Sequence, residues 1–471
     1  MGKYSNLGKN TILVFVGSLG SKVLTILMLP FYTAWLSVND FGNVDLISTY
    51  TSLIMSVVTL CMTDAIFRFP KDKTKEEQIE YFTSGLTLVL ICLFVTGLLY
   101  FLLLKIDMSV TWGVFKNYAT YIYVLLLLNF LQLYFQQFCR SIDKMKIYVI
   151  SGIILTVITA IVSILIIPKY GLDGYLYAQF IGAASSLLFI SYKINIFEYF
   201  SLSHYKFHVV KEMLSYSIPM IPNATLWWVL GASNRLIIEN NHGVYDVGIF
   251  AVANRFPSMI ALFFNSFFLS WQISVLEEYG SKDFKHFFNH IFRASFIVLF
   301  SISICLGIFS YLIILIFVDE KFLDAWRYIP FLSIASSLSA LSLFVGTIFM
   351  ATKKTIYFLT TSIWGSLLCV VLNFLFIPKW GLMGATISLL CAHFLIYVLR
   401  LVKTMQYVEV LNVRKYYLQL LILLLLALTI VYMSNIFYKI FIIISLLLVL
   451  ILMNYDFLKD LKLLVKKKKN E

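Results

Sequence analysis

Long apolar stretches, broken by short polar segments, run along the whole chain. A helix needs about 20 apolar residues to cross a bilayer, so we place a span wherever such a stretch lies between charged clusters. The pattern predicts an all-α integral membrane protein with about fourteen transmembrane helices. Their predicted ranges are 10–34, 43–66, 84–104, 117–138, 147–167, 172–194, 213–237, 246–272, 290–317, 327–350, 356–377, 382–402, 415–433 and 436–455.

Basic residues fall mainly in the polar segments on one side of these spans. Both chain ends and the loops after even-numbered spans hold most of the 37 lysines and arginines, including Arg400 and Lys403 at the end of the twelfth span. Because cytoplasmic loops are enriched in Lys and Arg, we expect both termini to be cytoplasmic. The basic tail 457–471 either lies on the inner leaflet as an amphipathic helix or is a solvated orientation signal.

One eight-residue segment occurs twice. IPKYGLDG at 167–174 returns as IPKWGLMG at 377–384, with six of eight positions identical, and the Asp-x-Gly segments at 40–42 and 246–248 form a second matched pair. We expect proline to stop each helix and glycine to permit a tight reversal. A duplication of six spans predicts two parallel lobes with a cleft between them.

The repeat also predicts the domain boundaries. The N-terminal lobe would comprise spans 1–6 in residues 1–205, and the C-terminal lobe spans 7–12 in residues 206–410. Spans 13 and 14 would follow in residues 411–456, before the basic cytoplasmic tail.

The composition narrows the possible classes of protein. Hydrophobic residues make up 61% of the 471 residues and charged residues only 13%, which excludes a soluble enzyme, a secreted disulfide scaffold and a disordered chain. The six cysteines have no metal-ligand spacing, so we interpret them as reduced packing residues and predict no metal site. The net charge of +13 is an orientation signal rather than a nucleic-acid surface.

Two cations lie deep inside predicted spans. At about 1.5 Å per residue, Lys22 and Arg255 are about 18 Å and about 14 Å from the ends of spans 1 and 8, near the middle of a core about 30 Å thick. These spans belong to opposite lobes, so the two cations would form an anion site across the cleft; the alternative is a structural partner for each. Arg235 either guards the outer mouth or snorkels beside Glu239.

Amides and aromatic residues within the spans are candidates for contact with sugars. Such side chains suit sugar hydroxyls and ring faces, although many serve instead as hydrogen bonds between helices. The predicted sugar-facing residues are Asn129, Gln132, Asn223, Trp227 and Asn254. Asp64 and Arg68 are four residues apart at the end of span 2 and are predicted to form a gating or structural pair.

The chain resembles the polysaccharide-transporter branch of the multidrug/oligosaccharidyl-lipid/polysaccharide exporter superfamily, the Wzx-type flippases. The resemblance rests on the order of spans, the two Pro-Lys-aromatic-Gly turns, the Asp-x-Gly segments, and residues 10–30, 64–69 and 234–238. It implies a flippase that moves undecaprenyl-diphosphate-linked oligosaccharides across the bacterial cytoplasmic membrane, for O-antigen, capsule or exopolysaccharide assembly. Lys22, Arg255 and Arg235 would then bind the pyrophosphate.

The resemblance also implies partners and a mode of coupling. The partners would be the lipid-linked glycan, membrane lipids, and a polysaccharide polymerase with its assembly machinery. No cofactor is implied, while coupling to an H⁺ or Na⁺ gradient stays open. Members of this branch typically carry an acidic residue where Asn234 stands, and this departure puts ion coupling at that position in doubt.

Three other functions fit the sequence less well. A lipid II flippase of the same superfamily would carry several arginines in spans 1 and 2, and a multidrug exporter would have an acidic residue in its cavity. A membrane glycan polymerase or ligase would need a large outer loop with catalytic residues, whereas the outer loops here are short. We therefore assign no catalytic residue and expect a transporter, not an enzyme.

Overall fold

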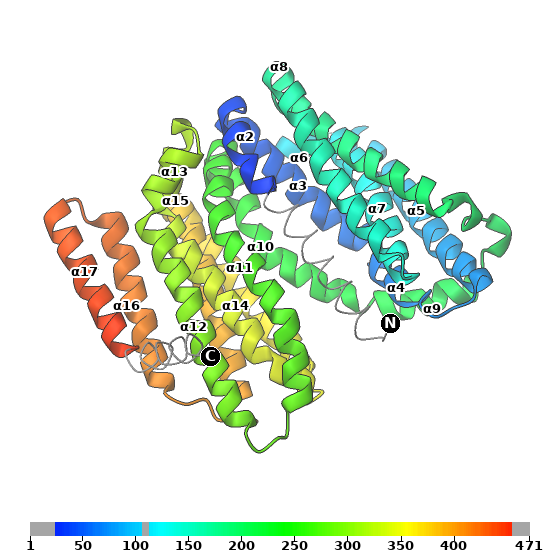
Figure 1. Ribbon diagram of the computed structural model, residues 1–471. Coiled ribbons are helices and arrows are strands. Elements are labelled where there is room, and N and C mark those ends of the chain that lie inside the picture. Colours follow the sequence, from blue (N-terminus) through cyan, green and yellow to red (C-terminus); the bar gives the residue numbers. More distant parts are fainter. Residues whose placement is uncertain (1–23, 106–112, 455–471) are drawn as a thin grey trace, which may run out of the picture. The chain divides into compact units, whose positions relative to one another are not determined.

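The computed structural model describes residues 24–105 and 113–454, which form helices and turns without any strand (Figure 1). The helices are α2 (Leu29–Trp35), α3 (Val38–Val58), α4 (Met62–Arg68), α5 (Lys75–Lys105), α6 (Gly113–Asn117), α7 (Ala119–Ser141), α8 (Met145–Ile194), α9 (Phe207–Ser217), α10 (Met220–His242), α11 (Val244–Glu278), α12 (Phe284–Ile308), α13 (Ser310–Phe317), α14 (Ile329–Ala351), α15 (Ile356–Thr404), α16 (Val413–Tyr432) and α17 (Ile436–Met453). Short 3-10 helices cover η1 (Ile196–Glu198), η2 (Leu202–His204) and η3 (Glu320–Arg327).

These helices have the length and composition of membrane spans. Within the described residues, nine helices qualify, and the bent pair α3 and α4 makes a tenth. Two of the nine, α8 and α15, are 50 and 49 residues long and each covers two predicted spans. Every predicted range overlaps a described helix, although the first range is described only from residue 24 onward. The chain is therefore an all-α, multi-pass membrane protein, as its sequence pattern predicts.

α8 and α15 each reverse direction at one glycine of the repeated motif. The backbone angles are φ 52° and ψ −126° at Gly171, and φ 54° and ψ −133° at Gly381. Residues with a Cβ rarely adopt this conformation, which explains why glycine stands there. The two arms of α8 then lie side by side, and the Ser186 hydroxyl donates to the Ser151 carbonyl at 3.0 Å. The structure corrects one expectation, because the helices continue through the motif prolines and the glycines alone make the reversal.

The last glycine of the motif has the same function in both copies. A Cβ on Gly174 would lie 2.9 Å from the Ile166 carbonyl oxygen, and one on Gly384 would lie 2.4 Å from the Phe376 carbonyl oxygen. Each glycine thus lets the returning arm pass close to the backbone of the first arm. The two motif copies therefore share their structure as well as their sequence.

The second predicted span, 43–66, is wrong as a single helix. α3 begins earlier, at Val38, because the Ser37 side chain and Asp40 form a reciprocal capping box. α3 and α4 meet at a 59° bend, where Leu60 and Cys61 take left-handed backbone angles. The sequence pattern missed the bend because the apolar stretch continues through it.

The prolines at 219 and 222 predict a kink in span 7, and the structure confirms a break at that place. α9 ends at Ser217, and α10 begins at Met220 with Pro219 as its N-cap. Proline is tolerated at a helix start, where its missing N–H removes no hydrogen bond.

Contacts divide the chain into two compact units, which are described separately below. Unit 1 comprises Met1–Val252, Phe317–Leu323 and Ser366–Ser388. Unit 2 comprises Ala253–Ile316, Asp324–Gly365 and Leu389–Glu471. These boundaries differ from those of the repeat, and the division into lobes at residues 205 and 410 stays a prediction.

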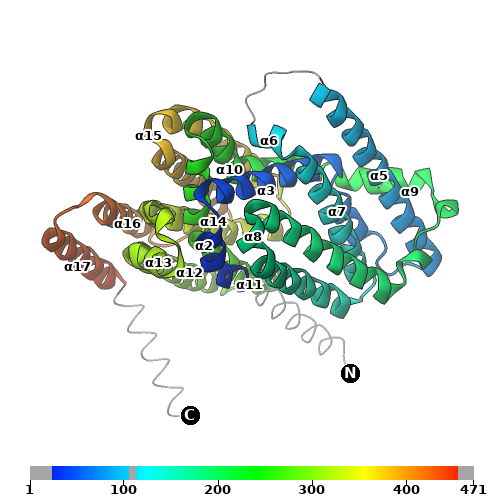
Figure 2. The same cartoon turned by 90° about the horizontal axis from the view of Figure 1, so that it is seen from above.

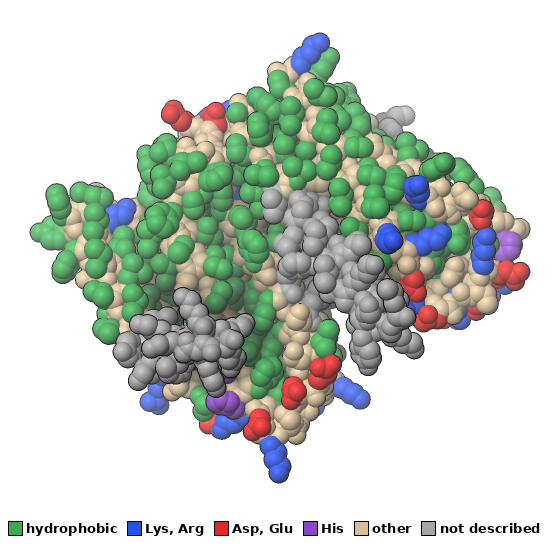
Figure 3. Space-filling view, viewed as in Figure 1, with side chains coloured by type: hydrophobic (Ala, Val, Ile, Leu, Met, Phe, Trp, Pro, Cys, Tyr) green, Lys and Arg blue, Asp and Glu red, His purple; other side chains and the backbone are tan. Residues whose placement is uncertain are grey.

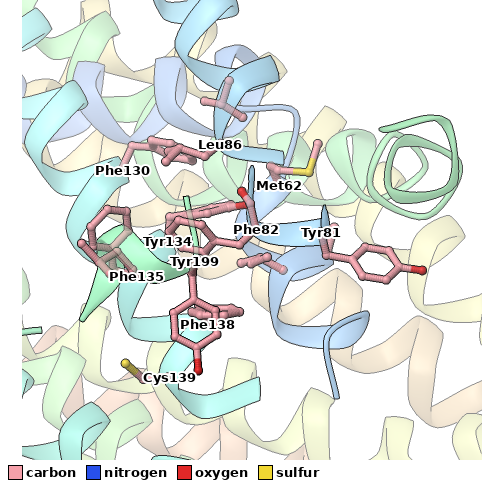
Figure 4. Close-up of a cluster of buried hydrophobic side chains, with 14 of the residues drawn as sticks. Met62, Tyr81, Phe82, Leu86, Phe130, Tyr134, Phe135, Phe138, Cys139 and Tyr199 are labelled. Carbon is pink, nitrogen blue, oxygen red and sulfur yellow. The ribbon is translucent and has the colours of Figure 1, made fainter. Parts of the chain in front are cut away.

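Unit 1 has an aromatic core where α4, α5, α7 and η1 meet (Figure 4). The rings of Phe82 and Phe138 lie 4.7 Å apart, and the Tyr134 hydroxyl donates to the Phe82 carbonyl at 3.0 Å. Tyr81 points away from this cluster, and its hydroxyl donates to Glu212 on α9 at 2.7 Å. The core therefore fixes α5 against α7, while Tyr81 fastens α9 to its side.

In unit 2 the helices α16 and α17 present apolar side chains to their surroundings. Only 6% of the residues of α17 are buried, and the side chains of Phe441 and Leu452 are each 70% exposed. In Figure 3, hydrophobic side chains cover the visible surface of these helices. A helix of this composition is stable only against lipid or another apolar partner.

Arg400 corrects the expectation that it is a loop residue. It lies in α15 and is fully buried in unit 2. Its guanidinium donates to the Thr361, Ser342 and Ser362 hydroxyls at 3.1, 3.3 and 3.2 Å, and it lies 4.8 Å from the centre of the Phe358 ring. Arg400 thus joins the second arm of α15 to the first arm of the same helix and to α14. All of these hydrogen-bond partners are neutral.

We predict that Arg400→Lys destabilises the protein by about 1.5–3 kcal/mol, because one ammonium cannot make the divergent bonds of a guanidinium. Thermal unfolding of the purified protein in detergent measures this. Arg414→Lys, at an exposed position of α16, is the matched control and should leave the unfolding temperature unchanged. Equal unfolding temperatures for the two variants would contradict the anchoring role.

We also predict that Gly171→Ala and Gly381→Ala each cost about 1–3 kcal/mol through backbone strain. Gly231→Ala is the control. A Cβ would meet no atom within 4 Å at either Gly171 or Gly231, so neither substitution causes crowding. Gly231 has helical backbone angles, so only the substitution at Gly171 strains the backbone. The control should be neutral or slightly stabilising. Equal unfolding temperatures for the Gly171→Ala and Gly231→Ala variants would refute the strained turn.

Candidate functional site

Within unit 1, α3 crosses the start of α11 at very close range. A Cβ on Gly42 would lie 2.2 Å from the Val244 carbonyl oxygen, and a Cβ on Gly248 would lie 2.2 Å from the Val38 carbonyl oxygen. Both glycines are the third residue of the matched Asp-x-Gly segments, so corresponding parts of the repeat pack reciprocally. Any side chain at either position would push the two helices apart.

An ion pair continues this contact along α3 and α10. The Arg235 Nε donates to Asp45 Oδ2, and each side chain is only 13% exposed. The guanidinium also lies 5.8 Å from the centre of the Phe250 ring. Because both charges have lost most of their water, removal of one partner would leave the other poorly compensated.

Hydrogen bonds complete the contact about one turn beyond Asp45 on α3. The Tyr50 hydroxyl donates to Glu239 Oε2 at 2.8 Å, and the Val114 backbone N–H donates to Glu239 Oε1 at 3.2 Å. The indole of Trp228 donates to the Thr49 carbonyl at 3.1 Å. We call this set of contacts, from Gly42 to Tyr50 on α3, the α3–α10/α11 contact.

The structure therefore gives Arg235 a partner that the sequence did not identify. Glu239, named as its neighbour in the sequence, binds Tyr50 and Val114, whereas Asp45 is the carboxylate that pairs with Arg235. Asp45 and Arg235 are 190 residues apart, so no local pattern reveals the pair. A role for Arg235 in binding pyrophosphate stays a prediction.

Of the two deep cations, the structure describes only Arg255. Lys22 lies outside the described residues, so the proposed anion site with Arg255 stays a prediction. Arg255 and its neighbour Asn254 are half-buried in the part of α11 that belongs to unit 2, two and three residues before Pro257.

The candidate sugar-facing residues are used in different ways. Asn129 lines a cavity between α3, α7 and α8 in unit 1. Gln132, one turn further along α7, is buried, and its amide nitrogen donates to Ser186 and Gln136 at 3.4 and 3.3 Å. Asn223 and Trp227 lie in α10, but their side chains are outside the described part of the structure.

The predicted pair of Asp64 and Arg68 does not form. Both residues lie on the short helix α4 and are exposed, and the ion pairs of the described residues do not include them. An exposed pair gains little because water solvates both charges. Spacing of four residues permits such a pair but does not require it.

Buried neutral polar residues stand at Asn234, where an acidic residue was expected, and at the adjacent Ser233. Asn234 and Asn373 are fully buried in unit 1, and the Asn373 amide nitrogen donates to the Ser233 hydroxyl at 3.3 Å. Asn234 Nδ2 and Asn373 Oδ1 have no protein partner in the described structure. An amide does not titrate, so Asn234 itself cannot carry a proton for coupled transport. No group of three metal-ligating His, Cys, Asp or Glu residues occurs in the described ranges.

We predict that Asp45→Asn and Arg235→Gln each destabilise the protein by about 3–5 kcal/mol, because each leaves one buried charge unpaired. The double variant should lose less than the sum of the two, with a coupling of about 0.5–3 kcal/mol. Thermal unfolding of the four proteins in detergent completes this cycle. Additive losses would show that the two side chains do not interact.

Comparison with known proteins places the chain in a family. A family model described as polysaccharide biosynthesis protein matches residues 7–271, which is more than half of the chain. A search of curated proteins gives no significant match.

Solved structures share the fold at low sequence identity. The lipid II flippase MurJ, in an inward closed conformation, has a TM-score of 0.68 and 17% identity, with 96% of this chain and 99% of that chain covered. An inward-facing multidrug resistance transporter of the MATE family and MOP superfamily has a TM-score of 0.66 and 14% identity, with coverage of 84% and 97%. A MATE transporter from Vibrio cholerae has a TM-score of 0.52 and 13% identity, with coverage of 85% and 96%.

Identities this low establish similarity of fold, while the family model provides the sequence relationship. The chain has the fold of the MOP superfamily and belongs to the polysaccharide biosynthesis protein family.

Proposed function

We propose that the chain is a flippase for undecaprenyl-diphosphate-linked oligosaccharides. It would move repeat units from the inner to the outer leaflet of the bacterial cytoplasmic membrane, for O-antigen, capsule or exopolysaccharide assembly. Family membership supports a role in polysaccharide biosynthesis, and the multi-pass fold supports transport across the bilayer. A polysaccharide polymerase and its assembly machinery would receive the product.

The α3–α10/α11 contact is the observation that carries a mechanism of alternating access. It joins helices from the two halves of the repeat through one ion pair, a few hydrogen bonds and two glycines. Polar contacts of this kind can be exchanged for water when helices separate, at a small net free-energy change per hydrogen bond. In the predicted topology, with both termini cytoplasmic, the contact lies at the outer ends of α3 and α10 and closes that side.

The electrostatics favour an anionic cargo that leaves the cell. Lys22 and Arg255, with Arg235 nearer the outer side, would hold the pyrophosphate while the lobes rock. Outward movement of a negative charge is favoured by about 2.3 kcal/mol per charge per 100 mV when the cytoplasm is negative. The membrane potential would thus assist transport, whether or not H⁺ or Na⁺ movement is coupled to it.

Deletion of the gene in its native host tests the function. Lipid-linked repeat units should accumulate on the cytoplasmic leaflet, and surface polysaccharide should disappear. Normal surface polysaccharide without accumulation would contradict the proposal.

The cation assignment is tested by complementation of the deletion strain. At normal expression, Lys22→Ala and Arg255→Ala should lower surface polysaccharide at least about tenfold, since loss of a charged hydrogen bond costs about 1.5–3 kcal/mol. Lys282→Ala removes an exposed cation and serves as the control. Full complementation by either deep-cation variant would remove that residue from the proposed pyrophosphate site.

A further inference from the structure

We propose that a cavity in unit 1, between α3, α7 and α8, binds one uncharged sugar ring of the exported glycan. This inference rests on the proposed function and adds a second binding element to it, separate from the cations. The three helices contact one another and lie side by side in Figures 1 and 2. The cavity has a volume of about 190 Å³.

The cavity has a mixed lining of apolar side chains and polar but uncharged groups. Its polar residues come from all three helices and are Ser48, Thr51, Ser52, Asn129, Tyr175 and Gln179. No Asp, Glu, Lys or Arg is among the lining residues. A lining without charge gives no counter-ion for a diphosphate and no carboxylate for a cation, whereas hydroxyls and amides match the hydroxyl groups of a sugar.

The lining has unused hydrogen-bonding capacity. The Thr51 and Ser52 hydroxyls donate to backbone carbonyls of α3 at 2.7 and 2.9 Å, which leaves their oxygens available as acceptors. The Asn129 and Gln179 side chains make no hydrogen bond to the described part of the protein. Each amide offers two N–H donors and one acceptor, and such groups inside a membrane protein are costly unless water or a ligand satisfies them.

Gln132 shows how a structural amide in the same helix differs. It is one turn from Asn129 on α7, and its amide nitrogen is already bonded to Ser186 and Gln136. Asn129 therefore does not serve as the hydrogen bond between helices that its neighbour provides. The contrast makes Gln132 a matched control for Asn129.

The size of the cavity selects a small ligand. A volume of 190 Å³ corresponds to about six water molecules, at about 30 Å³ each, and is below the range of about 300–1,000 Å³ for drug-sized ligands. One sugar ring fits these limits, and Tyr175, whose ring packs in a T-shaped arrangement 5.3 Å from the Tyr32 ring, adds an aromatic residue to the wall. The rest of the glycan and its diphosphate would lie outside the cavity.

Differential binding tests the cavity in the full-length protein, purified into lipid nanodiscs. The two probes are lipid-linked repeat units extracted from the native host and bare undecaprenyl diphosphate. The wild-type protein should bind the glycosylated lipid more tightly. Asn129→Leu and Gln179→Leu should each reduce this preference two- to tenfold, because one neutral hydrogen bond is lost, while the Kd for bare undecaprenyl diphosphate stays unchanged.

Two further variants keep the test decisive if a leucine variant folds poorly. Gln132→Leu should keep the preference for the glycosylated lipid, although it removes a buried hydrogen bond. Ser48→Phe, which would fill the cavity from α3, should abolish the preference without a change at either amide.

The outcomes separate the sugar cavity from the function itself. A wild-type protein that binds neither lipid would overturn the proposed function. A wild-type protein that binds both lipids equally, or Asn129→Leu, Gln179→Leu and Ser48→Phe variants that keep the wild-type preference, would overturn the sugar cavity and leave a water-filled space between helices.

Discussion

Two glycines set the closest approach between the two halves of the repeat in unit 1. Gly42 meets the backbone of α11 and Gly248 meets the backbone of α3, each at a distance that no Cβ permits. In a membrane, helix association gains little from the hydrophobic effect, so close backbone packing and polar contacts must supply the attraction. The pairing of Asp45 with Arg235 and of Tyr50 with Glu239 joins α3 to α10, which ends two residues before α11 begins, so these pairs lie next to the glycine crossing.

The contact is also suited to separation. It contains one buried ion pair and several hydrogen bonds, whereas the aromatic core around Phe82 and Tyr134 is a dense apolar cluster. Opening a polar contact to water replaces protein hydrogen bonds by water, while opening an aromatic core would expose apolar surface. The α3–α10/α11 contact is therefore expected to open and the aromatic core to stay intact, which fits the alternating access proposed above.

The sequence predicted those features that depend on local signals. Apolar stretches located the spans, Pro219 located the break before α10, and the repeated motif located both reversals. It correctly assigned the reversal to glycine, but it wrongly expected the proline to end each helix, whereas the helices continue through Pro168 and Pro378 to the glycine. The bend between α3 and α4 contains no charged residue, glycine or proline, so the sequence pattern could not locate it.

Features that depend on a distant partner could not be predicted in this way. Arg400 stands at the end of an apolar stretch like any loop cation, and only hydroxyls from other parts of unit 2 make its burial possible. Asn129 and Gln132 lie on one face of α7, yet Ser186 on α8 accepts a hydrogen bond only from Gln132. Their residue type within a span made both amides candidates, but the neighbouring helix decides which one is left for a ligand.

Cross-linking of the α3–α10/α11 contact tests its release during transport most directly. Val38→Cys and Val244→Cys, which border the two close-packed glycines of this contact, in a chain whose six native cysteines are replaced, would be joined by a short bifunctional thiol reagent, with each single-cysteine chain as control. We expect the cross-link to stop the appearance of new surface polysaccharide in the double variant, reduction to restore it, and the reagent to leave the single variants active. Undiminished polysaccharide export by the fully cross-linked protein would contradict an interface that must open.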